Sequence, residues 1–237
     1  MLAKRVPFAL ISLALVASGC GGGTSATLSI TSPEEGADLG GNVVSLALDA
    51  SGIDIVPADG DTSGTTGHFH VFVDREPVAA GEEVARTAGI VHAATNPVQI
   101  TGLSPGEHTF TVVYGDGAHH RIGDTEASVT VTTTGPSIKV DAAVHGSDIA
   151  VAANPVDLEI EVKPPSDEHL HYFFDVTPTL DGTPIPTDDP NITHSREVSL
   201  TYEDVAAGEH TIWVVVAGAD HVPLDPLVMD TAKVTVE

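Results

Sequence analysis

One short segment occurs twice in this sequence, and the duplication limits what the chain can fold into. The first copy is HFHVFVD at residues 68–74 and the second is HLHYFFD at residues 169–175. Their aromatic and β-branched residues predict β-strands, in which residues two apart point to the same face. Each copy therefore directs two imidazoles to one side of a sheet.

The other histidines repeat with the segment. Three more follow each copy in the same order and at nearly equal intervals: His92, His108 and His119, then His194, His210 and His221. The 101 residues from His68 to His169 suit two domains of about a hundred residues each. His120 adjoins His119, and His145 has no place in the pattern.

Short β-type segments separated by turn residues make up both halves, and no segment has a convincing helical period. Residues 156–162 alternate apolar with acidic side chains, which is typical of a strand with one buried face. The predicted strands are 27–31, 43–49, 68–74, 97–103, 108–114, 127–133, 137–144, 156–162, 169–176, 196–202, 210–216 and 232–236. This pattern predicts an all-β protein with two tandem immunoglobulin-like β-sandwich domains.

The predicted domain limits are residues 27–134 and 135–237, because a threonine run followed by Gly135-Pro136 ends a strand. The turn segments 103–109 and 205–211 resemble the E–F corner of bacterial immunoglobulin-like domains. That resemblance implies an architecture and no particular activity.

The N-terminal segment is predicted to be a targeting signal. Lys4 and Arg5 precede an apolar run that is too short to span a membrane, and Ala17-Ser18-Gly19-Cys20 follows. Residues 1–19 resemble a bacterial lipoprotein signal peptide, which implies a lipid on Cys20 and a flexible tether over residues 20–26. We therefore expect an extracytoplasmic protein anchored to a bacterial membrane, at the cell surface or in the periplasm.

The net charge argues against two classes of partner, and the cysteine count excludes disulfides and thiolate metal sites. The formal net charge is −25, so a basic surface for nucleic acid or for anionic lipid is not expected. Cys20 is the single cysteine, which leaves no pair for a disulfide and no thiolate metal site.

Sandwich topology predicts which histidines meet. In such a sandwich strand C, here residues 68–74, and strand F, here residues 108–114, are antiparallel neighbours, so the start of C lies beside the end of F. His68 and His70 open strand C, His119 follows strand F, and His92 precedes strand E at residues 97–103, so these four histidines gather at one rim. The connection that carries His92 is long. The expected metal ligands are His68, His70, His92 and His119 in the first domain and His169, His171, His194 and His221 in the second. Neutral imidazole suits zinc or copper.

Two interpretations of the histidines stay open. They bind a metal, or they are surface and hydrogen-bonded residues that the duplication copied. His108 and His210 open strand F at the opposite end and are expected to be structural. Asp74 and Asp175 are either carboxylates that orient metal-bound imidazoles or residues that begin a turn.

Several stretches resemble a histidine-rich secreted bacterial domain family of unknown function. They are the His-x-His strand ending in Asp, residues 184–186 (PIP), residues 208–211 (GEHT) and residues 218–228. The second copy matches this pattern over most of its length, whereas the first keeps residues 67–70 and Asp74 but lacks the proline-containing ending. The resemblance supports the histidine positions and implies no activity.

The leading functional hypothesis is a lipid-anchored binding protein with one histidine-rich zinc or copper site in each domain. The alternative is a structural or adhesive interaction module at the cell surface, whose protein partner is unknown. An enzyme is not expected, because the sequence has no nucleophile elbow, phosphate-binding loop or His-Glu-x-x-His motif.

Overall fold

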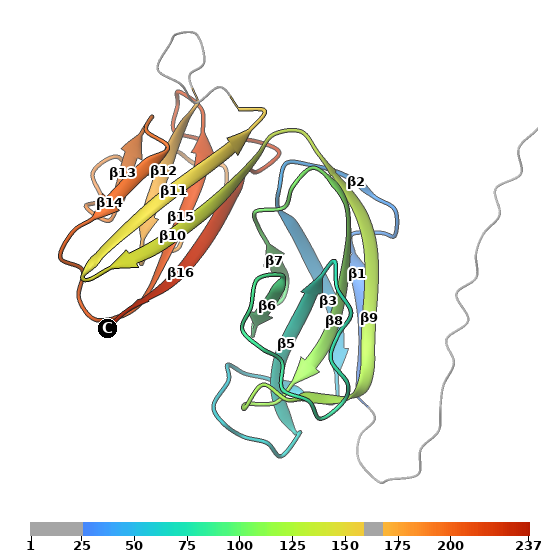
Figure 1. Ribbon diagram of the computed structural model, residues 1–237. Helices are drawn as coiled ribbons and strands as arrows, with labels where there is room; N and C mark the ends of the chain where they lie inside the picture. The colour runs from blue at the N-terminus through green and yellow to red at the C-terminus, as the bar shows by residue number, and fades with distance from the viewer. Residues whose placement is uncertain (1–25, 159–167) are drawn as a thin grey trace, which may run out of the picture.

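The structure is a computed structural model that describes residues 26–158 and 168–237, in which all regular elements are β-strands (Figure 1). The first half contains β1 (Thr27–Ser32), β2 (Asp38–Gly40), β3 (Val44–Ser51), β4 (Asp54–Ile55), β5 (Thr66–Val73), β6 (Ile90–Ala93), β7 (Val98–Ile100), β8 (Gly106–Gly115) and β9 (Arg121–Thr134). The second half contains β10 (Ser137–His145), β11 (Asp148–Val156), β12 (His169–Phe174), β13 (Ile192–Ser195), β14 (Ser199–Tyr202), β15 (Gly208–Ala217) and β16 (Met229–Val236). Within the two described ranges, no helix is long and apolar enough to cross a membrane.

Two sheets form a sandwich in each half. In the first, β1-β3-β7 packs against β2-β9-β8-β5-β4, with β6 also paired to β5. In the second, β10-β11-β14 packs against β13-β12-β15-β16. The prediction of an all-β protein with two tandem immunoglobulin-like sandwiches is confirmed.

The central strand β5 is buried on both faces. Phe69 and Val71 point into the core between the sheets, and Phe72 points to the outer face. The segment that links β5 to β6 covers this outer face and packs Val84 against Phe72. His68 and His70 alternate with the core residues, so they share the covered outer face.

The second half repeats this arrangement. Tyr172 belongs to the core between the sheets, whereas Phe173 packs on the outer side with Ile185 from the segment that links β12 to β13. His169 and His171 lie on the same outer face as Phe173. Duplication of the sequence has therefore duplicated a covered, histidine-bearing sheet face.

The strand predictions differ from the structure in two ways. Of the strand predicted at 156–162, Val156 is the last residue of β11, residues 157 and 158 belong to no strand, and residues 159–162 lie outside the described residues. β11 pairs along the whole of β10 through a tight turn at Gly146, and its buried side chains are Ile149, Val151 and Ala153. In addition, β2, β4, β6 and β13 were not predicted as strands, because none of them has more than four residues.

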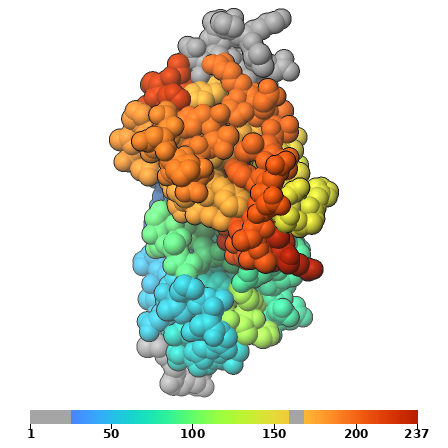
Figure 2. Space-filling model, turned by 90° about the vertical axis from the view of Figure 1, so that its left-hand side faces the viewer, coloured from blue at the N-terminus to red at the C-terminus, as the bar shows by residue number. Residues whose placement is uncertain are grey.

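The two sandwiches contact one another through Asn42, which is fully buried. Its side-chain Nδ2 donates to the carbonyl of Ile138 at 2.8 Å, and its Oδ1 accepts from the backbone N–H of Met229 at 2.9 Å. Buried Asp230 of the second half accepts a hydrogen bond from the Thr101 hydroxyl of the first at 3.0 Å. Figure 2 shows the resulting two-lobed particle, with the yellow-to-red second half above the blue-to-green first half.

Candidate metal centres

Four histidines of the first sandwich, here called the first quartet, meet on the outer face of β5. His68 and His70 come from β5 itself, and His92 lies on β6 directly opposite His70 in the strand register. His119 enters from the turn between β8 and β9. Each of the four offers one ring nitrogen, and these nitrogens all lie within 4.8 Å of one another.

The turn that carries His119 is fixed by backbone hydrogen bonds. The His119 N–H donates to the carbonyl of Asp116 at 3.0 Å, and the Asp116 N–H donates to the carbonyl of His120 at 2.9 Å. His119 takes a left-handed backbone conformation with φ of 66°, and its own carbonyl accepts from the Val84 N–H at 2.8 Å. The turn therefore aims the imidazole inward while its backbone supports the covering segment.

The second quartet consists of His169, His171, His194 and His221 and has the same construction. His169 and His171 lie on β12, and His194 on β13 is directly opposite His171. His221 has φ of 61°, and its carbonyl accepts from the Ile185 N–H at 2.8 Å. The sequence analysis placed all eight residues in two clusters, and the structure brings these eight together in two clusters.

One detail of that expectation needs correction. His92 and His194 were expected on a long connection before a strand, but both lie in short strands hydrogen-bonded to the His-x-His strand. Because a cross-strand partner lies at a fixed position on the sheet face, the strand register sets the positions of these two histidines.

The nitrogen separations match those of ligands around a small cation. In the first quartet Nδ1 of His119 lies 3.0 Å from Nε2 of His68 and 3.3 Å from Nε2 of His70. It also lies 3.0 Å from Nδ1 of His92. Tetrahedral zinc with Zn–N bonds of about 2.0–2.1 Å requires N···N separations of about 3.3–3.4 Å. The shortest separation, 2.8 Å between Nε2 of His68 and Nε2 of His70, must widen by about 0.5 Å for the quartet to surround such an ion.

Distances in the second quartet are more uniform. Nδ1 of His221 lies 3.2 Å from Nε2 of both His169 and His171. Its distance to Nδ1 of His194 is 3.1 Å. The same ring nitrogen from each matched histidine faces the centre, so the two quartets share one ligand pattern.

Hydrogen bonding alone does not account for this convergence. A ring nitrogen of neutral imidazole has either one N–H or one lone pair, so it makes one good hydrogen bond. Nδ1 of His119 has three nitrogen neighbours within 3.3 Å, and Nδ1 of His221 has three within 3.2 Å. A cation at the centre satisfies all four lone pairs of each quartet at once.

Burial keeps the central imidazoles neutral. In the first quartet, burial and the neighbouring histidines lower the pKa of His70 to about 2 and those of His68 and His92 to about 4. Burial and the adjacent Arg86 lower the pKa of His119. In the second quartet, burial and His169 lower the pKa of His171 to about 3. Neutral rings at physiological pH present lone pairs, the form in which imidazole binds metals.

Each quartet has a buried side and an accessible side. The strand pair of the first quartet is at most 2% exposed, whereas His92 and His119 are half-buried. A cavity of about 330 Å³ opens beside the second quartet and is lined by His169, His194, Ser195, Arg196, Ala219 and His221. An ion can therefore enter from solvent and reach nitrogens that the sheet holds in place.

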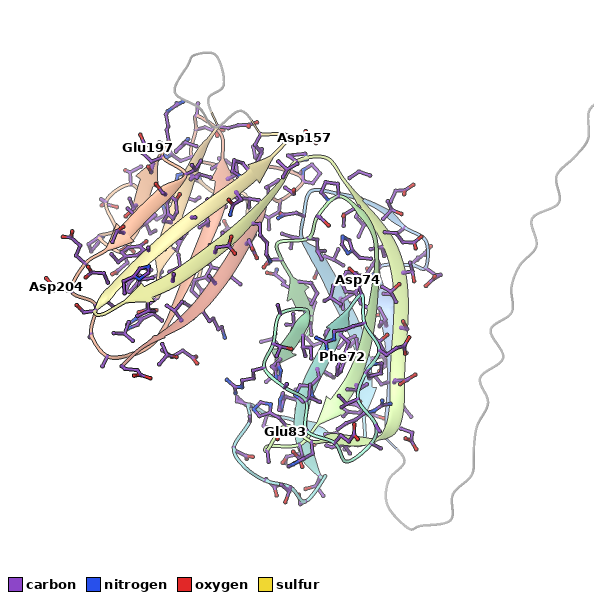
Figure 3. The ribbon with its side chains drawn as sticks, in the orientation of Figure 1. Phe72, Asp74, Glu83, Asp157, Glu197 and Asp204 are labelled. Carbon is purple, nitrogen blue, oxygen red and sulfur yellow. The ribbon has the colours of Figure 1, made fainter. Side chains whose placement is uncertain are left out.

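Asp74 and Asp175 do not orient these rings. Asp74 instead pairs with Nδ1 of His108 at 2.7 Å, while Nε2 of His108 lies 2.7 Å from the carbonyl of Ser104. Asp175 and His210 form the matched pair at 2.7 Å in the second sandwich. In Figure 3, Asp74 lies well above Glu83 in the first sandwich, and the backbone of Glu83 bridges to that of His120 beside the quartet. His108 and His210 are thus structural, as expected.

Support for the ligand rings differs from one histidine to another. Nε2 of His194 lies 3.0 Å from the carbonyl of Pro186, so its N–H donates there and leaves Nδ1 free to face the centre. Nδ1 of His68 and of His70 is buried and, among the described residues, has no hydrogen-bond partner.

Two residues near the first quartet were missed by the sequence analysis. Arg86 places its guanidinium NH2 3.0 Å from Nε2 of His119. Gly115 lies against the ring of His70, where a Cβ would come within 2.8 Å of Nε2. Only the glycine-rich stretch around Asp116 signalled a close approach of this kind.

The two quartets are separate sites. Figure 3 places Glu83 and Glu197 at opposite ends of the molecule. Glu83 is in the segment that covers the first quartet, and Glu197 follows Arg196 at the mouth of the second. One ion cannot be shared between them.

Comparison with known proteins identifies a family over part of the chain. Residues 46–134 match the family model described as "Domain of unknown function (DUF4399)". The match confirms the resemblance to a family of unknown function, and it falls on the first copy, whereas the sequence pattern is more complete in the second. No curated protein sequence matches the chain.

Similar solved structures include the fibronectin(III)-like modules of Clostridium thermocellum CbhA. That match has 14% identity, covers 89% of this chain and 94% of the other, and has a TM-score of 0.28. The FN1-FN3 domains of chicken CNTN1 match at 12% identity, with 91% and 67% of the two chains covered and a TM-score of 0.25. The fold assignment rests on the sheets described above.

Proposed function

We propose that this protein binds a divalent transition metal, zinc or copper, in each histidine quartet and is held outside the cytoplasm by a lipid on Cys20. The observation that carries the metal proposal is the convergence of four ring nitrogens in each sandwich. One ring nitrogen in each quartet has three nitrogen neighbours, which is more than its single hydrogen bond can satisfy and which a bound metal would satisfy.

The donor set narrows the choice of metal. Four neutral imidazoles offer no oxygen ligand, so calcium and magnesium are poor candidates. Imidazole nitrogen suits zinc and copper, and copper(II) binds a given nitrogen site more tightly than zinc does. Four protein ligands also complete a tetrahedron around zinc, which leaves no position for a substrate. This arrangement supports holding or carrying a metal rather than catalysis.

The anchoring part of the proposal rests on the sequence. The N-terminal segment that ends in Ala17-Ser18-Gly19-Cys20 lies outside the described residues. Its likeness to a lipoprotein signal supports cleavage before Cys20 and an extracytoplasmic location. We also propose that the two metal-binding domains have the limits 27–134 and 135–237.

Calorimetric titration tests the metal proposal. The chain from Gly21 onward, expressed without a histidine tag and treated with chelator, is titrated with zinc and separately with copper. We expect about two equivalents of metal per chain, and one in each single variant His70→Ala and His171→Ala. His145→Ala is the matched control, because His145 is exposed and belongs to neither quartet. Absence of binding at micromolar metal, or equal loss in the control, would rule the proposal out.

A further inference from the structure

The first quartet has a neighbour that works against a bound cation. Arg86 is exposed, and its NH2 lies 3.0 Å from Nε2 of His119, the nitrogen that points away from the centre. A guanidinium is always charged and only donates hydrogen bonds. Nε2 of His119 must therefore accept, and in a neutral ring the proton then sits on Nδ1.

That arrangement excludes a metal from the same nitrogen. Nδ1 of His119 is the atom that faces the other three histidines. For a cation to bind it, Nδ1 must present its lone pair, so the ring proton moves to Nε2 and meets the N–H of Arg86. The contact and the metal are compatible only if Arg86 moves away or the ring loses both protons.

Charge acts in the same direction. The guanidinium lies beside the ligand ring, and a divalent cation at the centre meets its repulsion in addition to the lost hydrogen bond. Because Arg86 is exposed, salt should weaken the repulsive part. Position 187, which lies 101 residues after Arg86 as His169 lies after His68, is Thr187 and has no charge.

We propose that Arg86 is a latch on the first quartet: it holds His119 in the form that cannot bind metal, and it must leave before a cation binds. This inference rests on the proposed function, since it concerns the affinity of the same site. The first quartet then holds its ion less tightly than four histidines alone would.

Zinc affinity of the first quartet alone tests the latch. His194→Ala with His221→Ala disables the second quartet at half-buried positions, and circular dichroism checks that the fold is retained. In this background, zinc is titrated in competition with a chromophoric chelator, with Arg86 present and with Arg86→Met. We expect Arg86→Met to raise the zinc affinity by at least about tenfold, and the gain to shrink in high salt.

Arg75→Met is the matched control. Arg75 lies in the same covering segment but donates to the Thr87 hydroxyl and to the carbonyl of Ala88. It should change the affinity much less. Equal or lower affinity in Arg86→Met, while zinc still binds, overturns the latch and leaves the metal proposal intact. Absence of zinc binding with and without Arg86 overturns both.

Discussion

Replacing Gly115 by alanine should remove the first metal site and leave the second. A Cβ at position 115 would lie 2.5 Å from Nδ1 and 2.8 Å from Nε2 of His70, whereas ordinary contact begins at 3.4 Å. The His70 ring must therefore retreat by roughly 1 Å, because the contact is otherwise strongly repulsive. Metal–ligand distances tolerate only about 0.2 Å.

The expected loss is large for binding and moderate for stability. Affinity at the first quartet should fall by at least about 10- to 100-fold, the loss that even an outer-shell substitution causes. Forcing a methyl group against a buried ring should cost about 1–3 kcal/mol of unfolding free energy.

Metal content measured by mass spectrometry after dialysis against limiting zinc is the assay. The unaltered protein should retain about two ions per chain and Gly115→Ala about one. The second quartet serves as the internal control, because it already has an alanine at the matched position: Ala217 pairs with His169 as Gly115 pairs with His68. The ring planes of His169 and His171 lie at 47° to each other, whereas those of His68 and His70 lie at 84°. Two ions retained in Gly115→Ala would refute the reasoning and show that His70 can adopt the second arrangement.

Three further predictions concern stability. Asn42→Ala should lower the unfolding free energy by about 2–4 kcal/mol, since it leaves the buried Ile138 carbonyl and Met229 N–H unpaired. Urea denaturation measures this change, and a loss below about 1 kcal/mol would contradict the prediction. The pKa of His70, 6.5 in the unfolded chain, is lowered to about 2 by burial and the neighbouring histidines, so below pH 6.5 the unfolded chain takes up a proton that the folded one does not. The metal-free protein should therefore lose stability as the pH falls from 6.5 toward 4, and the double variant His70→Leu/His171→Leu should lose less. If thermal melting shows the same loss in the unaltered protein and in the double variant, this account is contradicted. Asp175 raises the pKa of His210, so this pair stabilises the fold below pH 6.5, and its contribution disappears as the pH rises through the raised pKa. Asp175→Asn should therefore lower the melting temperature more at pH 5.5 than at pH 8. An equal lowering at the two pH values would contradict this prediction.

Much of the site was predictable because strand geometry is regular. A His-x-His pair on a strand must share a face, and antiparallel neighbours must bring the start of one strand beside the end of the other. Those two facts placed His68, His70 and His119 together. The repeat then transferred the same placement to the second half.

What could not be predicted depends on short or local interactions. β6 and β13 form because they pair with a histidine-bearing strand, which a segment of only four residues does not reveal. β11 has small alanines and Pro155, so its alternation was weaker than that of the acidic stretch after it. The contact of Arg86 with His119 joins residues 33 positions apart and has no sequence signature.

The most direct test of the central claim is native mass spectrometry of the untagged chain from Gly21 onward, after exposure to zinc or copper and removal of excess metal. The account predicts a species with two ions, one-ion species for His70→Ala and for His171→Ala, and a metal-free species when both are changed. A metal-free spectrum for the unaltered chain, or two ions retained without His70 and His171, would contradict it.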